Sequence, residues 1–582
     1  MDQFAAPSGA AVSDLWKVPS GEIVASLKKH SGSLIAVGLF SGLINLLYLV
    51  PAIYMLQIYD RVLISQSENT LIALTVLVIG LFVVTGLLEG VRSSAMSRIG
   101  DALGEDLSSR IYTAMFNQQL STANGFGNQP IWDLNRLQQF FSSGGLNAFL
   151  DLPWLPIFII TTFLLHPVLG GFLTLGAVAL FFTAWISERI TRTPLAQANE
   201  LATAASGLVT SHLRNAEVVH ALGMLPQLSK RWSLLQVRAR DFQQHAMSRI
   251  RIAGGFTRIL RMVLQSGTLG LGAWLAIQGD VTPGVMIAAA ILATRALSPL
   301  ESVISQWKSF LSTMLSTERL THLLATNPNV VKGMDIPRPA GRVVVENIFV
   351  SPPNNKQFVL KGLSFKLVPG EVLGVLGPSA AGKSTLARVL TGVWPAQIGR
   401  VQIDGSDIKN LDRSVIGPAM GYLPQDIELF SGTVGENISR FGPLESSMVI
   451  DAANACGIHG GLLGLTQGYD TPIGDAGIAL SAGQRQLLGL ARAIYGKPSL
   501  IVLDEPSSNL DESGQHNLQL AIKAMKSWGS AVVVISHQLS VLRQTDRLLM
   551  MKEGQILKLG KTDELLSSPI LIKKKDTHAS HH

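Results

Sequence analysis

The first half of the chain contains long stretches without charged residues. Asp, Glu, Lys and Arg are absent from residues 31–59, 69–88, 152–187, 262–279 and 281–294. A helix needs about 20 apolar residues to cross the hydrocarbon core of a membrane. The stretch 152–187 is long enough for two helices, and His166-Pro167 with Gly170-Gly171 predicts the turn between them. The pattern predicts six membrane spans, at 33–57, 69–90, 152–166, 168–187, 258–278 and 282–301; the alternative for the last is a buried core helix.

The Lys and Arg residues of this half lie mostly in two connections, after the second span and after the fourth. Only Arg61 lies in the three connections on the opposite side. Because positive loops stay in the cytoplasm, we expect both connections and both termini to be cytoplasmic. The two connections have few Pro residues and are predicted to be helical extensions of the spans. Residues 1–30 lack the apolar core of a cleavable signal peptide and are predicted to be a short cytoplasmic segment.

The pattern changes after the sixth span. Pro and Asn residues at 326–340 indicate a linker that follows a membrane domain at 31–325. From residue 341 to 570, short Val, Ile and Leu runs alternate with helical patterns and Gly turns, as in a parallel sheet covered by helices. The fold class expected is therefore a six-helix membrane bundle fused to an α/β domain, with a tail at 571–582.

Composition agrees with a membrane protein. Hydrophobic residues make up 47% of the 582 residues and charged residues 15%, whereas soluble domains carry about 25% charged residues. These values exclude a wholly soluble or a disordered chain. The net charge of +7 is largely a topology signal, and no nucleic-acid-binding module is recognisable. The single cysteine, Cys456, rules out an internal disulfide and is expected to be a packed thiol.

The α/β half contains a phosphate-binding pattern, G-x-x-x-x-G-K-[ST]. It follows the predicted strand 371–376 and precedes a helical pattern at 385–390, which is the context that the motif requires. Its glycines let backbone N–H groups surround phosphates, Lys383 reaches the β- and γ-phosphates, and the Ser384 hydroxyl ligates Mg²⁺. The predicted binding residues are Gly377, Pro378, Ser379, Ala380, Ala381, Gly382, Lys383, Ser384 and Thr385.

Two adjacent acids end a second buried strand, 500–503. Asp504 fits the Mg²⁺-side carboxylate of a nucleotide triphosphatase, and Glu505 should point differently and polarise the attacking water. The alternative is an ordinary solvated strand end. Three further segments are weaker alone: Ser481-Ala-Gly483-Gln484 opens a helix, Gln425 follows a short strand, and His537 follows the strand 531–535.

In this order, the motifs resemble the nucleotide-binding domain of the ATP-binding cassette (ABC) family. The resemblance covers about residues 341–570 and implies ATP and Mg²⁺ as cofactors, with Ser384, Gln425 and Asp504 at the metal. It implies a homodimer in which each ATP lies between the phosphate loop of one chain and Ser481, Gly483 and Gln484 of the other. Glu505, His537 and Lys383 are the implied catalytic residues.

Three positions depart from the family pattern. Ala482 replaces a usual Gly and adds only a methyl group. Pro352 stands where a Tyr often stacks on adenine, so Phe349 or Phe358 is left as the candidate for that contact. Asp475 stands where exporters usually have Glu, in a segment expected to face the membrane half.

Segments of the membrane half resemble type I secretion transporters, most closely their PrtD-like group. They are Pro51–Val62, Asp151–Phe158, His166-Pro167 and Arg295–Glu301. The resemblance implies export of polypeptides with uncleaved C-terminal signals from the bacterial inner membrane, through a periplasmic adaptor and a TolC-like outer-membrane channel. A charge within a span tends to face a cavity or a partner, so Arg295 is a candidate for the translocation path. Arg258 and Arg261 line the same path or extend toward the membrane surface.

Two other functions fit parts of this pattern. One is export of lipid or of small hydrophobic molecules by the same architecture. Membrane lipid is an expected partner of the protein in either case. The other is a membrane-anchored ATPase regulator that transports nothing, although six spans with polar residues are costly to keep without a path. With only about 30 residues before the first span and no cysteine near them, we expect no leader-cleaving peptidase domain.

Overall fold

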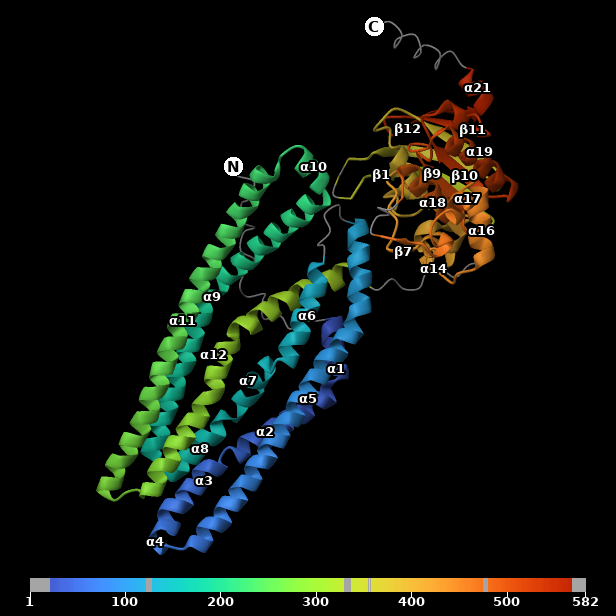
Figure 1. The fold of residues 1–582 in the computed structure, drawn as a ribbon. Coiled ribbons are helices and arrows are strands. Elements are labelled where there is room, and N and C mark those ends of the chain that lie inside the picture. Colours follow the sequence, from blue (N-terminus) through green and yellow to red (C-terminus); the bar gives the residue numbers. More distant parts are fainter. Residues whose placement is uncertain are drawn as a thin grey trace. The chain divides into compact units, whose positions relative to one another are not determined.

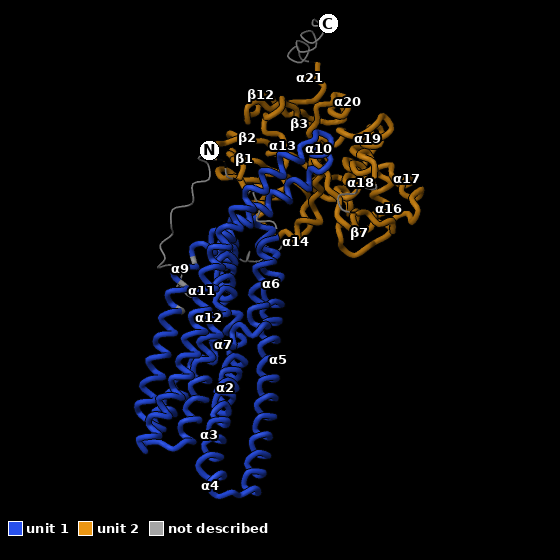
Figure 2. Tube along the Cα trace, turned by 60° about the vertical axis from the view of Figure 1, so that its left-hand side comes forward, with its two compact units in different colours: residues 1–118, 125–328 blue, residues 119–124, 329–582 orange. Residues whose placement is uncertain are grey.

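A computed structural model describes residues 21–121, 128–328, 337–353, 355, 357–474 and 480–567. The chain divides into two compact units, residues 1–118 with 125–328 and residues 119–124 with 329–582 (Figure 2). Parts of four sequence predictions lie outside the described residues. These are residues 1–20 of the N-terminal segment, 329–336 of the linker, Asp475 and the tail 571–582.

The first unit is helical, and six of its described helical segments are long and apolar enough to cross a membrane, which confirms the predicted spans. The connections after the second span and between the fourth and fifth spans contain helical extensions of the spans, as predicted. Single helices α5, α9 and α11 run for 54, 48 and 54 residues. The elements are α1 (Glu22–Lys29), α2 (Ser31–Leu47), α3 (Val50–Gln57), a π-helical turn (Ile58–Val62), α4 (Leu63–Ser65), α5 (Glu68–Ser121), α6 (Gln129–Ser142), α7 (Gly145–Asp151), a 3₁₀ turn (Leu152–Trp154), α8 (Leu155–Leu165), α9 (Pro167–Arg214), α10 (Ala216–Ala221), α11 (Leu225–Gln278) and α12 (Pro283–Thr326).

The turn between the third and fourth spans is tighter than the sequence predicted. Helix α8 ends at Leu165 and α9 begins at Pro167, so the turn is His166 alone, in extended conformation. The prediction that Gly170 and Gly171 form part of the turn is wrong, because both lie within α9. A Cβ atom at Gly170 would lie 2.3 Å from the Phe163 ring. Gly170 therefore serves close packing of α8 on α9 rather than chain reversal.

Helix α12 is the centre of this unit. It packs against α3, α6, α7, α8, α9 and α11, and half of its most apolar window is buried. Helices α9 and α11 lie side by side along their length (Figure 1). The core around α12 contains mainly small and branched residues, which let helices approach closely. They include Ala288, Leu292, Ala293, Ala296, Leu297 and Leu300.

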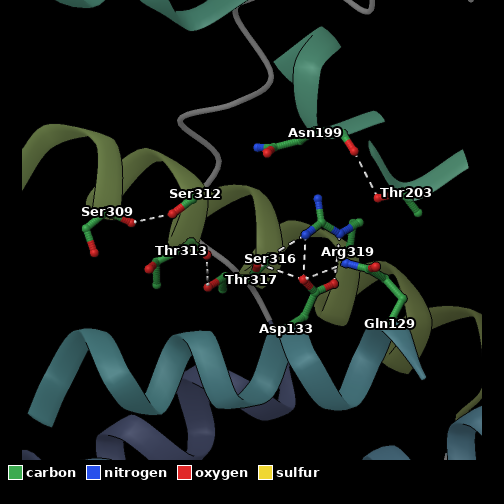
Figure 3. A network of polar contacts seen from close by, with 10 residues as sticks. All are labelled: Gln129, Asp133, Asn199, Thr203, Ser309, Ser312, Thr313, Ser316, Thr317 and Arg319. Atoms are coloured by element: carbon green, nitrogen blue, oxygen red, sulfur yellow. Dashed lines mark hydrogen bonds and ion pairs between the residues drawn. The ribbon is translucent and has the colours of Figure 1, made fainter. Parts of the chain in front are cut away.

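Helix α6 is held to α12 by a buried acid, shown in Figure 3. The Asp133 side chain is 1% exposed. It accepts hydrogen bonds from Arg319 Nε at 2.8 Å, Ser316 Oγ at 2.8 Å and Gln129 Nε2 at 3.3 Å. Because a buried carboxylate needs compensation for lost water, these donors fix the register of the two helices.

The second unit is an α/β domain with two larger sheets and a two-stranded one. A mainly parallel sheet has the strand order β12-β11-β3-β10-β9-β6, with β12 as its antiparallel edge strand, and an antiparallel sheet has the order β2-β1-β4-β5. The strands are β1 (Val343–Val350), β2 (Leu360–Leu367), β3 (Val372–Leu376), β4 (Ile398–Ile403), β5 (Ser406–Asp407), β6 (Met420–Leu423), β7 (Gly432–Thr433), β8 (Pro472–Ile473), β9 (Leu500–Asp504), β10 (Ala531–Ile535), β11 (Arg547–Lys552) and β12 (Gln555–Lys561).

Buried apolar runs form the centre of the parallel sheet, as predicted from the sequence. Residues of β9 and β10 are all buried. Ile535 of β10 pairs with Val375 of β3 and with Asp504 of β9, so the carboxyl ends of these strands are level. The helices are α13 (Lys383–Leu390), α14 (Arg413–Ile416), α15 (Val434–Ile438), α16 (Ser446–Ala455), α17 (His459–Leu463), α18 (Ala482–Ile494), α19 (Glu512–Ser527), α20 (Leu539–Leu542) and α21 (Thr562–Leu566).

Candidate nucleotide site

The predicted phosphate loop connects β3 to α13 at the carboxyl edge of the parallel sheet. Gly382 caps α13 with a φ of 93°, and Ala380 has a φ of 63°, both in the left-handed region. A Cβ atom at Gly377 would lie 2.5 Å from the carbonyl oxygen of Met551, which is backbone and cannot move aside. The motif glycines are therefore required by the path of the loop. The loop leads into α13, where Lys383 and Thr385 are buried.

The Lys383 ammonium is held above this loop. It donates to the carbonyl oxygens of Gly377 at 2.8 Å and Pro378 at 3.2 Å, and it lies 2.9 Å from His537 Nε2. Burial lowers the pKa of Lys383, and the nearby Glu505 and Asp504 carboxylates oppose that shift. The lysine is thus a cation placed by backbone dipoles at a phosphate-binding loop.

Asp504 ends β9 and faces the start of α13. It is buried and hydrogen-bonded to Ser384, and its Oδ1 atom has no hydrogen-bond partner among the described residues. Burial raises the pKa of Asp504, while the Ser384 hydrogen bond opposes the rise. No group of three His, Cys, Asp or Glu side chains in the described ranges could hold a metal alone. A hydroxyl beside an unsatisfied carboxylate oxygen fits Mg²⁺, which takes its other ligands from phosphate and water.

Glu505 faces different partners from Asp504. Its backbone has a φ of 50°, an uncommon value for a residue other than glycine, and its N–H donates to the Ile535 carbonyl at 3.0 Å. The Glu505 Oε1 atom lies 3.2 Å from His537 Nε2. Burial raises the pKa of Glu505, against the opposing effects of His537 and Lys383. His537 Nε2 can donate to Glu505 or accept from Lys383, but one nitrogen cannot do both at once.

The other predicted residues divide into two groups. Gln425 is exposed just after β6, whose Leu423 pairs with Leu503 of β9. The charge of the next residue, Asp426, raises the pKa of Asp504, so this loop lies near the acid. Ser481, Gly483 and Gln484 lie instead at the start of α18. Within the described ranges, no hydrogen bond or ion pair joins them to the phosphate loop.

The start of α18 is closed by its own side chains. Gln484 N donates to Ser481 Oγ at 3.2 Å, and Ser481 N donates to Gln484 Oε1 at 2.9 Å. This capping box fixes the first turn of α18. The polar side chains of Ser481 and Gln484 lie at the exposed N-terminus of the helix. Ala482 is compatible with this geometry, because it is the first helical residue.

Sequence reasoning missed Gln486, which ties α18 to the loop of Glu505. The Gln486 residue is 1% exposed. Its Nε2 donates to the carbonyl oxygens of Pro506 at 3.0 Å and Glu505 at 3.4 Å, and its Oε1 accepts from Asn509 at 3.2 Å. The available signal was an amide on the apolar face of a helix, where a buried polar group needs partners.

An aromatic pair lies near the position of the missing adenine contact. The rings of Phe349 and Phe358 are 5.5 Å apart in an edge-to-face arrangement, and Phe358 is 38% exposed. Pro352, which stands at the usual tyrosine position, has no ring to stack. Of these residues, Phe358 presents the most accessible aromatic surface for a base.

The parallel sheet has a phosphate loop, paired acids and a histidine at one edge. Its domain is joined to a unit with six helices long enough to cross a membrane. This combination defines one half of an ABC exporter. The family described as ABC transporter transmembrane region matches residues 34–299, and the family described as ABC transporter matches residues 360–508. The chain belongs to the ABC transporters and, within them, to the ATP-binding proteins of type I secretion systems. It is a multi-pass membrane protein that binds ATP and couples its hydrolysis to transport. The sequence-based family and fold predictions are thus confirmed.

Two relatives and one solved structure illustrate the likeness. The type I secretion system ATP-binding protein PrsD of Rhizobium meliloti is 40% identical, over 93% of this chain and 94% of its own length. The alpha-hemolysin translocation ATP-binding protein HlyB of Escherichia coli is 28% identical, over 91% of this chain and 76% of its own. A bacterial Atm1-family ABC exporter with ATP bound shares the fold, with a TM-score of 0.83 at 20% identity over 95% of this chain and 99% of the other.

Proposed function

We propose that this chain exports polypeptides across the bacterial inner membrane as the ATPase of a type I secretion system. The observation that carries the proposal is the 40% identity to a type I secretion ATP-binding protein, which extends over nearly the whole of both chains. This similarity covers the membrane unit as well as the nucleotide-binding domain. It therefore concerns the part of the chain that would conduct the cargo as well as the part that hydrolyses ATP.

In the proposed cycle, the cassette residues act at the γ-phosphate. Lys383, which the phosphate loop already holds through its carbonyl oxygens, stabilises charge on the phosphate. Glu505 orients the attacking water and accepts its proton, for which a carboxylate with a raised pKa is suited. His537 contacts both residues and reports whether the γ-phosphate is present. A Mg²⁺ ion held by Ser384, Asp504 and Gln425 would supply further neutralisation of phosphate charge.

The lack of hydrogen bonds between the start of α18 and the phosphate loop, among the described residues, is compatible with a dimer. The remaining predicted contacts, Ser481, Gly483 and Gln484, show no bond to their own chain's loop among the described residues. We propose that they complete the ATP site of a second copy, so that two nucleotides close a homodimer. Both termini would lie in the cytoplasm, and a periplasmic adaptor and an outer-membrane channel would continue the path.

The test compares the medium of cells that carry the intact protein with cells that carry Lys383→Ala. We expect one or a few polypeptides to disappear from the medium and to accumulate inside the cells. Lys523→Ala is the matched control, since Lys523 is an exposed lysine of α19 that belongs to none of the nucleotide-site motifs. An unchanged set of secreted proteins in the Lys383→Ala strain would contradict polypeptide export and favour lipid or small-molecule cargo.

A further inference from the structure

An exposed arginine lies within the sixth membrane-long helix. Arg295 projects from α12, whereas its neighbours Ala293, Ala296 and Leu297 are buried. Its guanidinium lies over the ring of Tyr48 at 4.5 Å from the centroid. Among the described residues it has no hydrogen bond and no ion pair. Because a charge facing lipid is costly, we expect this side of α12 to face a cavity or another polypeptide.

Three acids of the membrane unit already have partners. Asp151 pairs with Arg92 at 2.7 Å and also accepts from Asn45 at 3.0 Å. Glu301 pairs with Arg261 at 3.0 Å. Glu89 accepts a hydrogen bond from the Tyr48 hydroxyl. Asp151 and Glu301 are each paired with another arginine, and Glu89 is linked to Arg295 only through Tyr48. Among the described residues, Arg295 forms no ion pair of its own.

A row of hydroxyl groups continues from Arg295 along the same face of α12. Serines follow it at intervals of three and four residues, which places them on one side of a helix. Ser305 donates to the Ser302 carbonyl at 2.8 Å. Ser312 donates to the Ser309 carbonyl at 3.0 Å, as Figure 3 shows. The hydroxyls of Ser305 and Ser312 are thus satisfied by their own helix, so these two groups are polar without a fixed partner elsewhere. The row consists of Ser298, Ser302, Ser305, Ser309 and Ser312.

We propose that Arg295 contacts carboxylate groups of the exported polypeptide and makes the path selective for acidic segments. This inference rests on the proposed export function. The planar guanidinium can stack on Tyr48 with one face and still present its N–H edge to a carboxylate in a two-bond arrangement. The small serine hydroxyls beside Arg295 can form weak hydrogen bonds with the exported polypeptide. Weak bonds allow an extended polypeptide to move along the helix.

The test uses the full chain in lipid nanodiscs and two fluorescent Gly- and Ser-rich peptides. They are identical except that one has glutamates where the other has glutamines. We expect the intact transporter to bind the glutamate peptide about threefold more tightly, the scale of a partly exposed ion pair. Arg295→Gln should abolish the preference, and Arg295→Lys should retain part of it.

The control is Arg251→Gln, which removes an exposed arginine of α11 outside the predicted span and should keep the full preference. A preference that persists in Arg295→Gln overturns the inference, as does equal or absent binding of both peptides to the intact protein. Folding of each variant is checked by its melting temperature, and Arg295→Lys decides the result if Arg295→Gln is unstable. If Lys383→Ala alters the secreted proteins but Arg295→Gln keeps the preference, polypeptide export stands and only the role of Arg295 fails.

Discussion

Replacing Gln486 by leucine should destabilise the cassette by an amount that its contacts define. Leucine keeps most of the volume of this buried side chain but removes its hydrogen bonds. The Glu505 carbonyl still accepts from Ser508 N at 3.2 Å, and Asn509 is exposed to water. The buried Pro506 carbonyl has no other hydrogen bond among the described residues. One orphaned carbonyl costs about 2 kcal/mol, which lowers the melting temperature of a domain of this size by roughly 4–8 °C.

The assay is thermal unfolding of the full-length, detergent-solubilised protein, followed by tryptophan fluorescence at one heating rate. Gln519→Leu on α19 is the matched control, because Gln519 makes no hydrogen bond in the described structure. ATP turnover, measured well below the melting temperature, should fall in Gln486→Leu with little change in KM, since Gln486 positions the Glu505 loop rather than binding ATP. A melting temperature equal to that of the unaltered protein would refute the reasoning, as would an equal loss in the control.

Four further outcomes are expected. Glu505→Gln should still bind ATP, but its turnover should fall about 10²–10⁴-fold, the usual contribution of a general base; normal turnover in an ATPase assay would contradict the role. Because burial raises the pKa of Glu505, its ionised form is lost as pH falls through a value above the usual glutamate range, and the acidic limb of the turnover profile should lie there. The thiol of Cys456 is buried and its pKa is raised, so iodoacetamide should label it only after unfolding, as followed by mass spectrometry. Gly377→Ala should lose ATP binding because its Cβ would meet the Met551 carbonyl, whereas Gly417→Ala, with open space around it, should not.

Features set by local chemistry could be predicted from the sequence. The six spans follow from runs that are free of charged residues over most of their length, because the membrane excludes charge over a fixed thickness. The phosphate loop follows from glycine spacing, and the central strands follow from apolar runs long enough to be buried on both faces. The error at Gly170 arose because glycine has two uses, in turns and in close packing, and only the neighbouring Phe163 decides between them.

Features that depend on distant partners could not be predicted. Gln486 contacts a loop about 20 residues away, and Asp133 binds Arg319 at a separation of 186 residues. Neither pairing leaves a periodic signal in the sequence. The left-handed backbone of Glu505 is also a product of its surroundings, since the register of β9 and β10 holds its N–H against Ile535. Such conformations occur where surrounding structure outweighs local preference.

The role of an arginine in the membrane unit can be inferred only when its partner in the structure is known. Arg92 and Arg261 would look like Arg295 in the sequence, because all three interrupt or border apolar runs. The structure gives the first two an acid each and leaves Arg295 on an aromatic ring, beside a row of serines. A paired arginine fixes helix packing, whereas an unpaired one in a low-dielectric setting keeps its attraction for an anion that arrives later. The same helix therefore carries a packed apolar face toward the core and, on another side, an arginine and serines. The proposed selectivity for acidic segments requires this second side to face the exported chain.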